Sequence, residues 1–180
     1  KVYCRIFQKI FRIALPLLPY REPEILESIE LIPETVVKNG CKKPIIVTDK
    51  GIVNLGLIDS LVEALKKSEI PFAIYDETVP NPTTDNVAKA YDLYKKENCD
   101  CLIAFGGGSS MDCAKALGVQ IVYPKKTLGQ LKGILKVHKK LPLLIAIPTT
   151  AGTGSETTLA AIITDSKTRH KYAINSFPLI

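Results

Sequence analysis

Apolar runs alternate with amphipathic segments along most of the chain. Four short aliphatic or β-branched runs bounded by polar residues predict buried strands over 44–49, 72–75, 101–105 and 143–147. Between these runs, apolar residues recur at helical spacing and predict helices over 57–67, 83–96 and 110–122. Later in the chain, two further extended segments, 157–164 and 171–174, flank a polar stretch at 165–167 and predict a hairpin.

This order of elements predicts a Rossmann-like α/β fold. Strands separated by helices pair in parallel through right-handed crossovers, which gives an open, mostly parallel sheet with helices on both faces. Ligands of such sheets bind beyond the carboxyl ends of the strands. We therefore expect one crevice to be lined by the residues that follow the four strands, namely Asp49, 76–81, 106–112 and 149–156.

The first 28 residues stand apart from this alternation. Residues 2–15 predict an amphipathic helix whose polar face carries Arg5, Gln8, Lys9 and Arg12. Such a helix either lies on a membrane surface or docks on the domain or on a partner subunit. Because the helix carries only a few basic residues, we favour docking. We accordingly divide the chain into a helical extension over 1–28 and an α/β domain over 29–180.

Composition narrows the class of protein. The chain is 46% hydrophobic and 23% charged, and its net charge of +6 is spread along the sequence. The basic clusters lack interleaved aromatic residues, so nucleic acid is not an expected partner. No apolar run is long enough to span a membrane.

The cysteines do not form a recognisable metal site. They are irregularly spaced, and the chain has only 2 histidines, so no zinc ligand pattern can be assembled. Alternate residues of an extended segment point to opposite faces, which argues against a shared site at Cys99 and Cys101. We expect reduced thiols in a cytoplasmic protein, at Cys4, Cys41, Cys99, Cys101 and Cys113.

The strongest local motif joins a predicted strand to a predicted helix. Gly106, Gly107 and Gly108 let the backbone turn and approach a ligand closely. The helix that follows offers free N–H groups and the positive end of its dipole, and Ser109 and Ser110 either cap it or bond a phosphate oxygen. The motif predicts a diphosphate cradle, although it is neither GxGxxG nor a Walker loop. A tight turn without a ligand is the alternative.

Three further features point to the same crevice. The loop 148–156 reads PTTAGTGSE, whose small hydroxyl side chains suit a wall against phosphate, ribose or nicotinamide, although Ser155 could instead begin a helix. Asp49, at the end of a strand, either accepts the hydroxyls of a ribose and repels a 2′-phosphate, or only caps a turn. Asn81, between two prolines, either makes a rigid turn or presents its amide to the ligand.

Taken in order, these motifs resemble the iron-containing (group III) alcohol dehydrogenases. The matching segments are VTDKG at 47–51, PNPT at 80–83, GGGSSMD at 106–112 and PTTAGTGSE at 148–156, and the resemblance runs from about Glu30 to the C-terminus. It implies a dehydroquinate-synthase-like domain that binds NAD, with NADP possible. It also implies an all-helical domain after residue 180, whose Asp and His ligands hold Fe²⁺ or Zn²⁺.

The resemblance also implies roles for individual residues. Asp49 would meet the adenosine ribose, and Lys171 would reach the ribose or nicotinamide. The diphosphate would be surrounded by Gly107, Gly108, Ser109, Ser110 and Asp112. The cofactor cleft would be lined by Asn81, Thr149, Thr150 and Thr153. Hydride would pass between the nicotinamide and an alcohol or aldehyde, while the metal polarises the substrate oxygen.

Other functions stay open at this point. A glycerol or polyol-phosphate dehydrogenase, or a dehydroquinate-synthase-like lyase, would share the scaffold, although PTTAGTGSE argues against the lyase. A free-standing nucleotide-binding module would not be an enzyme. We favour an NAD-dependent iron-type alcohol dehydrogenase, of which these 180 residues alone are inactive. Apolar surface that stays exposed when the helical domain is absent favours self-association of these residues. We also expect the enzyme to be a homo-oligomer.

Overall fold

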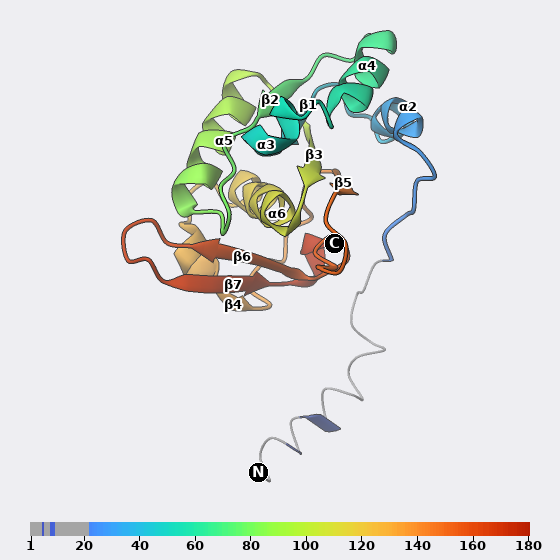
Figure 1. Cartoon of the computed structure of the whole chain (residues 1–180). Coiled ribbons are helices and arrows are strands. Elements are labelled where there is room, and N and C mark those ends of the chain that lie inside the picture. The colour runs from blue at the N-terminus through green and yellow to red at the C-terminus, as the bar shows by residue number, and fades with distance from the viewer. Residues whose placement is uncertain (1–4, 6–7, 10–21) are drawn as a thin grey trace.

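A computed structural model describes residues 5, 8, 9 and 22–180 (Figure 1). Arg5, Gln8 and Lys9 are helical and exposed, whereas the rest of the predicted helix over 2–15 lies outside the described residues. Within the described part of the chain, no helix has both the length and the apolar character that crossing a membrane requires.

Four parallel strands form the central sheet, in the order β2-β1-β3-β5. They are β1 (Pro44–Val47), β2 (Ala73–Tyr75), β3 (Cys101–Gly106) and β5 (Leu144–Pro148). Every residue of β1 and β3 is buried, because these central strands are covered on both faces. The predicted strands and their parallel pairing are confirmed, with small shifts of the strand ends.

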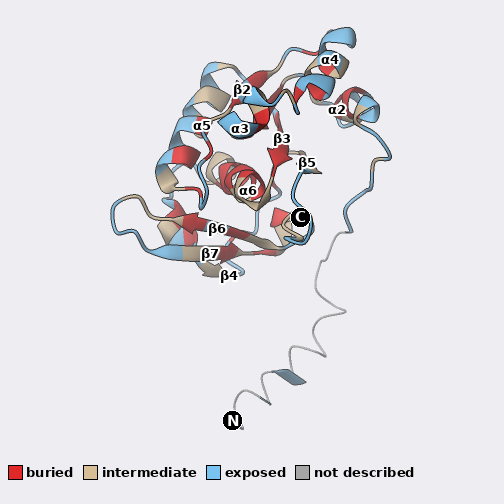
Figure 2. Cartoon of the chain, viewed as in Figure 1, coloured by how far each residue is buried: buried red, intermediate tan, exposed pale blue. Residues whose placement is uncertain are grey.

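Helices cover both faces of this sheet, as the sequence predicts. Side chains alternate along the strands, so Val47 and Ala104 face the core formed with α5 (Thr84–Lys96) and α6 (Gly108–Val122). Ile46 and Ile103 face the opposite core, which includes residues of α2 (Ile32–Lys38), α3 (Lys50–Asn54) and α4 (Asp59–Lys67). The burial colours of Figure 2 follow this layering, with the sheet and α6 innermost.

A smaller three-stranded sheet forms a further layer. Its order is β4-β7-β6, and it comprises β4 (Gly133–Ile134), β6 (Ala160–Thr164) and β7 (Lys171–Asn175). β6 and β7 pair antiparallel across the predicted hairpin, where Asp165 Oδ1 accepts hydrogen bonds from two backbone N–H groups. α6 packs against both sheets (Figure 1), which explains why most of its residues are buried.

The sequence patterns missed the short elements. α2 begins beside Pro33, and α3 begins after Asp49, but each has too few residues to display a helical period. The two-residue strand β4 lies in a lysine-rich stretch without an apolar run. The remaining short elements are the 3-10 helices η2 (Ile29–Leu31), η3 (Leu128–Leu131) and η4 (Phe177–Leu179).

Candidate functional site

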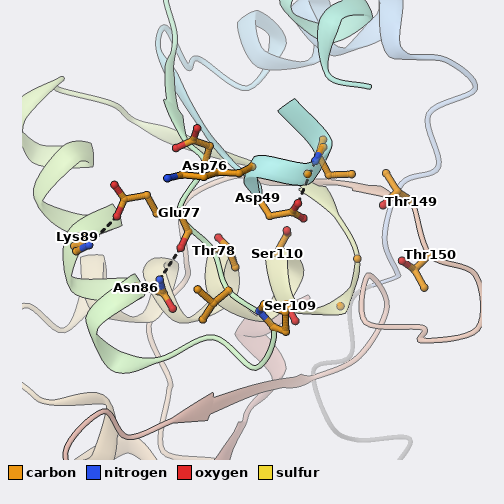
Figure 3. A pocket seen from close by; sticks show the side chains of 17 residues that line it. Asp49, Asp76, Glu77, Thr78, Asn86, Lys89, Ser109, Ser110, Thr149 and Thr150 are labelled. Atoms are coloured by element: carbon orange, nitrogen blue, oxygen red, sulfur yellow. Dashed lines mark hydrogen bonds and ion pairs between the residues drawn. The ribbon is translucent and has the colours of Figure 1, made fainter. Parts of the chain in front are cut away.

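A cleft of about 890 Å³ opens at the carboxyl ends of the strands of the parallel sheet (Figure 3). Residues that follow each of the four strands line it, at 49–52, 76–80, 107–110 and 149–150. Asn86 and Lys89 of α5 complete the lining. The prediction that the segments after these strands meet in one crevice is confirmed.

Backbone forms the floor of this cleft at the glycine motif. A Cβ at Gly107 would lie 2.9 Å from Thr150 Oγ1, and one at Gly108 would lie 3.0 Å from Ser155 Oγ. Gly106 has a φ of +144° and would bring a Cβ within 2.6 Å of Ser110 Oγ. The two loops therefore lie so close that a Cβ at Gly107 or Gly108 would make a hydroxyl of the facing loop shift. Glycine leaves the first N–H groups of α6 accessible to a ligand.

The serines of the motif do not cap α6. Its N-cap is Gly107, which has no side chain to offer, so Ser109 and Ser110 both stand in the first turn. Ser109 Oγ accepts a hydrogen bond from the backbone N–H of Asn81 at 3.3 Å. Ser110 Oγ is buried and has no hydrogen-bond partner among the described residues. A buried hydroxyl without a partner costs free energy, so this atom is a candidate to bond a ligand in the cleft.

Asp49 caps a helix and also lines the cleft. Its Oδ1 accepts a hydrogen bond from the N–H of Ile52 at 3.1 Å and so caps α3. Its Oδ2 faces the glycine motif, 3.7 Å from the position that a Cβ added at Gly106 would occupy. One carboxylate oxygen therefore fixes the local backbone while the other faces the cleft.

Asn81 and Lys171 lie together beside the cleft, without lining it. Asn81 has a φ of +56°, a left-handed conformation that asparagine tolerates well. Its side-chain oxygen accepts a hydrogen bond from Lys171 Nζ at 2.6 Å, and its N–H binds Ser109. The turn is thus rigid and connects the β6–β7 sheet to the first turn of α6.

A family model described as iron-containing alcohol dehydrogenase matches residues 26–180. The chain belongs to the iron-containing alcohol dehydrogenase family. The choline dehydrogenase of Bacillus subtilis (strain 168) is 43% identical over 141 residues, which make up 77% of this chain and 35% of that relative. The match confirms the resemblance read from the motifs.

Solved structures agree with this assignment. The structure of a 1,3-propanediol oxidoreductase has a TM-score of 0.84 and 32% identity, and the match covers 91% of this chain and 44% of that one. The structure of a sulfoacetaldehyde reductase from Bifidobacterium kashiwanohense, in complex with NAD+, has a TM-score of 0.75 and 28% identity. The match covers 91% of this chain and 44% of that one. The chain therefore spans less than half the length of these relatives.

Besides Asn81 and Lys171, two further residues that the resemblance assigned to the cofactor, Thr153 and Asp112, lie outside the cleft lining. Thr153 is adjacent to the glycine motif, because its Cγ2 would lie 3.7 Å from a Cβ added at Gly108. Asp112 faces β6, where the backbone N–H of Ile162 contacts its carboxylate. Burial raises the pKa of Asp112 to about 6, and Lys115 partly offsets that shift.

No sequence pattern predicts the burial of Lys115 in α6. Lys115 is only 1% exposed, and its Nζ donates to the carbonyl oxygen of Thr158 and to Thr158 Oγ1. Burial lowers the pKa of Lys115 to about 8, against the opposing charges of Asp112 and Glu156. Lysine in a helix is normally solvated, and packing of the second sheet over α6 accounts for this burial. Lys115 therefore ties α6 to the segment that follows the loop 148–156.

Lys115→Met should remove a pH dependence of stability. The unfolded lysine has a pKa near 10.5 and the folded one near 8, so the unfolded chain binds more protons between these values. Relative to Lys115→Met, the free energy of unfolding of the wild type therefore rises over this pH range by on the order of 1–3 kcal/mol. The buried thiols Cys99 and Cys113, whose pKa is raised by burial, act in the opposite direction but are common to both proteins. Urea denaturation of the wild type and of Lys115→Met from pH 7 to 10.5 measures this change in the free energy of unfolding. Exposed Lys66→Met should keep the rise, and parallel curves for wild type and Lys115→Met would contradict the assignment.

A helix cap at the start of α5, not among the predicted features, supports part of the cleft wall. Thr83 and Asn86 form a capping box at the start of α5. Asn86 Nδ2 also donates to Tyr75 Oη at 3.2 Å and to the carbonyl oxygen of Glu77 at 2.7 Å. Lys89 pairs with Glu77 at 2.7 Å. A Thr-x-x-Asn pattern before a helical run is the signal that predicts this arrangement.

Proposed function

We propose that this chain is the nucleotide-binding part of an enzyme that transfers hydride between NAD(H) and an alcohol or aldehyde. The observation that carries the proposal is the cradle where Gly107 and Gly108 meet the hydroxyl-rich loop 149–155 at the N-terminus of α6. Helix N-termini with glycine backbone around them bind phosphate groups. A relative in the same family has been solved in complex with NAD+, which supports the choice of ligand.

The cleft fits this cofactor in size and in donors. The N–H groups of Gly108 and Ser109, at the start of α6, would hold the diphosphate together with the buried Ser110 hydroxyl. Thr149 and Thr150 would offer hydroxyls along the opposite wall. Asp49 would accept the hydroxyls of the adenosine ribose through Oδ2. When bound, NAD supplies the hydride acceptor, and this chain's residues orient it.

Catalytic metal ligands would come from outside this chain. The described lining of the cleft contains no histidine or cysteine. His138 and His170 are exposed, and His170 belongs to the β6–β7 hairpin. Fe²⁺ or Zn²⁺ would therefore be held by a helical domain after residue 180, facing the nicotinamide end of the cleft. The family match favours this dehydrogenase over a dehydroquinate-synthase-like lyase or a free-standing module.

Two properties of the whole protein belong to the same proposal. The described cysteines Cys41, Cys99, Cys101 and Cys113 are free thiols, which supports a reducing, cytoplasmic location. Exposed Leu55 and Leu57 offer apolar surface for a homo-oligomer, which light scattering of the purified protein measures.

Titration calorimetry with NAD+ tests the proposed function. We expect one binding site per chain and no comparable binding of a nucleotide that lacks the diphosphate, such as AMP. Equal affinity for AMP and NAD+ would contradict a cradle for the diphosphate.

Asp49→Gly should shift the cofactor preference from NAD+ toward NADP+. The change removes both the acceptor for the ribose and the repulsion of a 2′-phosphate. We expect the ratio of the two affinities to change by about tenfold or more, because a hydrogen bond to a charged group is worth about 1.5–3 kcal/mol. Binding titrations with both nucleotides measure this ratio.

Asp49→Asn separates the carboxylate charge from the helix cap. Asparagine keeps an oxygen that can accept from the N–H of Ile52, so α3 stays capped. This variant should gain affinity for NADP+ without loss of thermal stability. If wild type already binds NADP+ as tightly as NAD+, the assignment of Asp49 is wrong.

A further inference from the structure

A second group of ligand atoms lies at the opposite end of β3 from the cleft. The thiols of Cys41 and Cys101 and a carboxylate oxygen of Asp100 all lie within 4.8 Å of one another. Cys41 precedes β1 and Cys101 begins β3, and the parallel register places Pro44 beside Cys101. No ligand pattern is visible in the sequence, because the group joins two distant stretches of the chain.

We propose that Cys41, Asp100 and Cys101 form a binding site for a thiophilic divalent cation such as Zn²⁺ or Cd²⁺. In a tetrahedral zinc site with metal–sulfur bonds of about 2.3 Å, the ligand atoms lie roughly 3.8 Å apart. The observed spacing therefore requires only small side-chain movements. The fourth position would be filled by water or by the carbonyl oxygen of Asn39, which lies 3.8 Å from Cys41 Sγ.

The backbone holds these ligands in place. Asp100 Oδ2 accepts from the N–H of Lys42 at 2.7 Å, and Oδ1 accepts from the N–H of Lys43 at 3.0 Å. The N–H of Cys41 donates to the carbonyl oxygen of Val36 at 3.0 Å. Each carboxylate oxygen keeps a second lone pair for a cation. Such outer hydrogen bonds orient the ligands of known metal sites, so this group is preorganised.

The neighbouring Cys99 does not belong to the group. Cys99 packs in the core formed with α5 and α6, whereas Cys101 packs in the core on the opposite face of the sheet. The side chains of Cys99 and Cys101 thus pack on opposite faces of the sheet, as the alternation of an extended segment predicts. Cys41 packs against the same core as Cys101 and is partly exposed, which gives an ion access from solvent.

Without an ion, both thiols are protonated. Burial raises the pKa of Cys101 far above its ordinary value, and burial likewise raises the pKa of Cys41. A coordinated cation deprotonates a thiol outright, so binding would replace two S–H protons with two metal–sulfur bonds and release both protons to solvent.

The site would be structural. It lies at the start of β3, a strand of six residues whose other end reaches the cleft. At about 3.3 Å per residue, the two ends are roughly 16 Å apart. A cation here would fasten β1 to β3 and would not touch a nucleotide in the cleft.

Cadmium titration of the chain tests this site. Every sample carries Cys4→Ser, because Cys4 lies outside the described residues, and is reduced and desalted under argon. We expect one Cd²⁺ per chain, a thiolate-to-cadmium band in the ultraviolet, and displacement of Cd²⁺ by excess Zn²⁺. Cys41→Ser and Cys101→Ser should each lose most of the band and bind at least about tenfold more weakly.

Cys99→Ser is the matched control and should keep the wild-type band and affinity. Circular dichroism verifies that each variant is folded, and Cys41→Ser, at the partly exposed position, keeps the test decisive if Cys101→Ser fails to fold. A wild type without the band, or a folded Cys41→Ser variant that binds Cd²⁺ as wild type does, would overturn the proposal.

Discussion

Gly108→Val should reduce the affinity for NAD+ by at least about 100-fold, or about 2.7 kcal/mol. A Cβ at this position would lie 3.0 Å from Ser155 Oγ and 3.7 Å from Thr153 Cγ2, so the side chain would occupy the space between the two loops. The diphosphate must come within hydrogen-bond distance of the backbone at the same place. Because Gly108 has helical backbone within α6, valine is compatible with its conformation and the fold should survive.

Titration calorimetry and circular dichroism together test this expectation. Gly129→Ala is the control, since its Cβ would meet only Thr127 Oγ1, at 3.9 Å, far along the chain from the motif. It should bind NAD+ as wild type does. A folded Gly108→Val variant with unchanged affinity would remove the diphosphate from this part of the cleft.

The 180-residue chain should form no detectable NADH from primary alcohols or diols, even with Fe²⁺ or Zn²⁺ added. Hydride transfer of this kind needs a nicotinamide, an alcohol and a metal that stabilises the developing alkoxide. The described residues of the cleft offer groups for the nicotinamide cofactor but no histidine or thiol for a metal. A cation at Cys41 and Cys101 would be too distant to polarise a substrate in the cleft.

The comparison is a longer polypeptide that includes the helical domain proposed to follow residue 180. That protein should be active with the same alcohols and metals, while the 180-residue chain still binds NAD+. Turnover by the shorter chain at a rate comparable to that of the longer one would contradict the division of labour between two domains.

The sheet and its cleft could be predicted from the sequence because their signals are local. Ile45 to Val47 and Leu102 to Phe105 are apolar on both faces, which is typical of central parallel strands. Ligands bind beyond the carboxyl ends of parallel strands. Once the strands are placed, this rule predicts that Asp49, Gly107 and Thr149 line one cleft.

What the sequence did not predict depends on contacts between distant segments. Lys115 has no sequence signal for burial, because its environment is created by β6 packing over α6. Cys41 and Cys101 come together only through the register of β1 and β3. The low helix propensity of glycine predicts a start of α6 at Ser110, whereas the helix begins at Gly108, where tertiary contacts override that preference.

Amide resonances of the isotopically labelled chain, followed by NMR during addition of NAD+, show directly whether the cofactor binds at the glycine motif. A diphosphate held at the N-terminus of α6 predicts large, saturable shifts at Gly107, Gly108, Ser109 and Ser110, smaller shifts at Thr149 and Thr150, and none around Cys41 at the far end of the sheet. Saturable shifts that leave the glycine motif unchanged and gather elsewhere would contradict the assignment of this cleft to the cofactor.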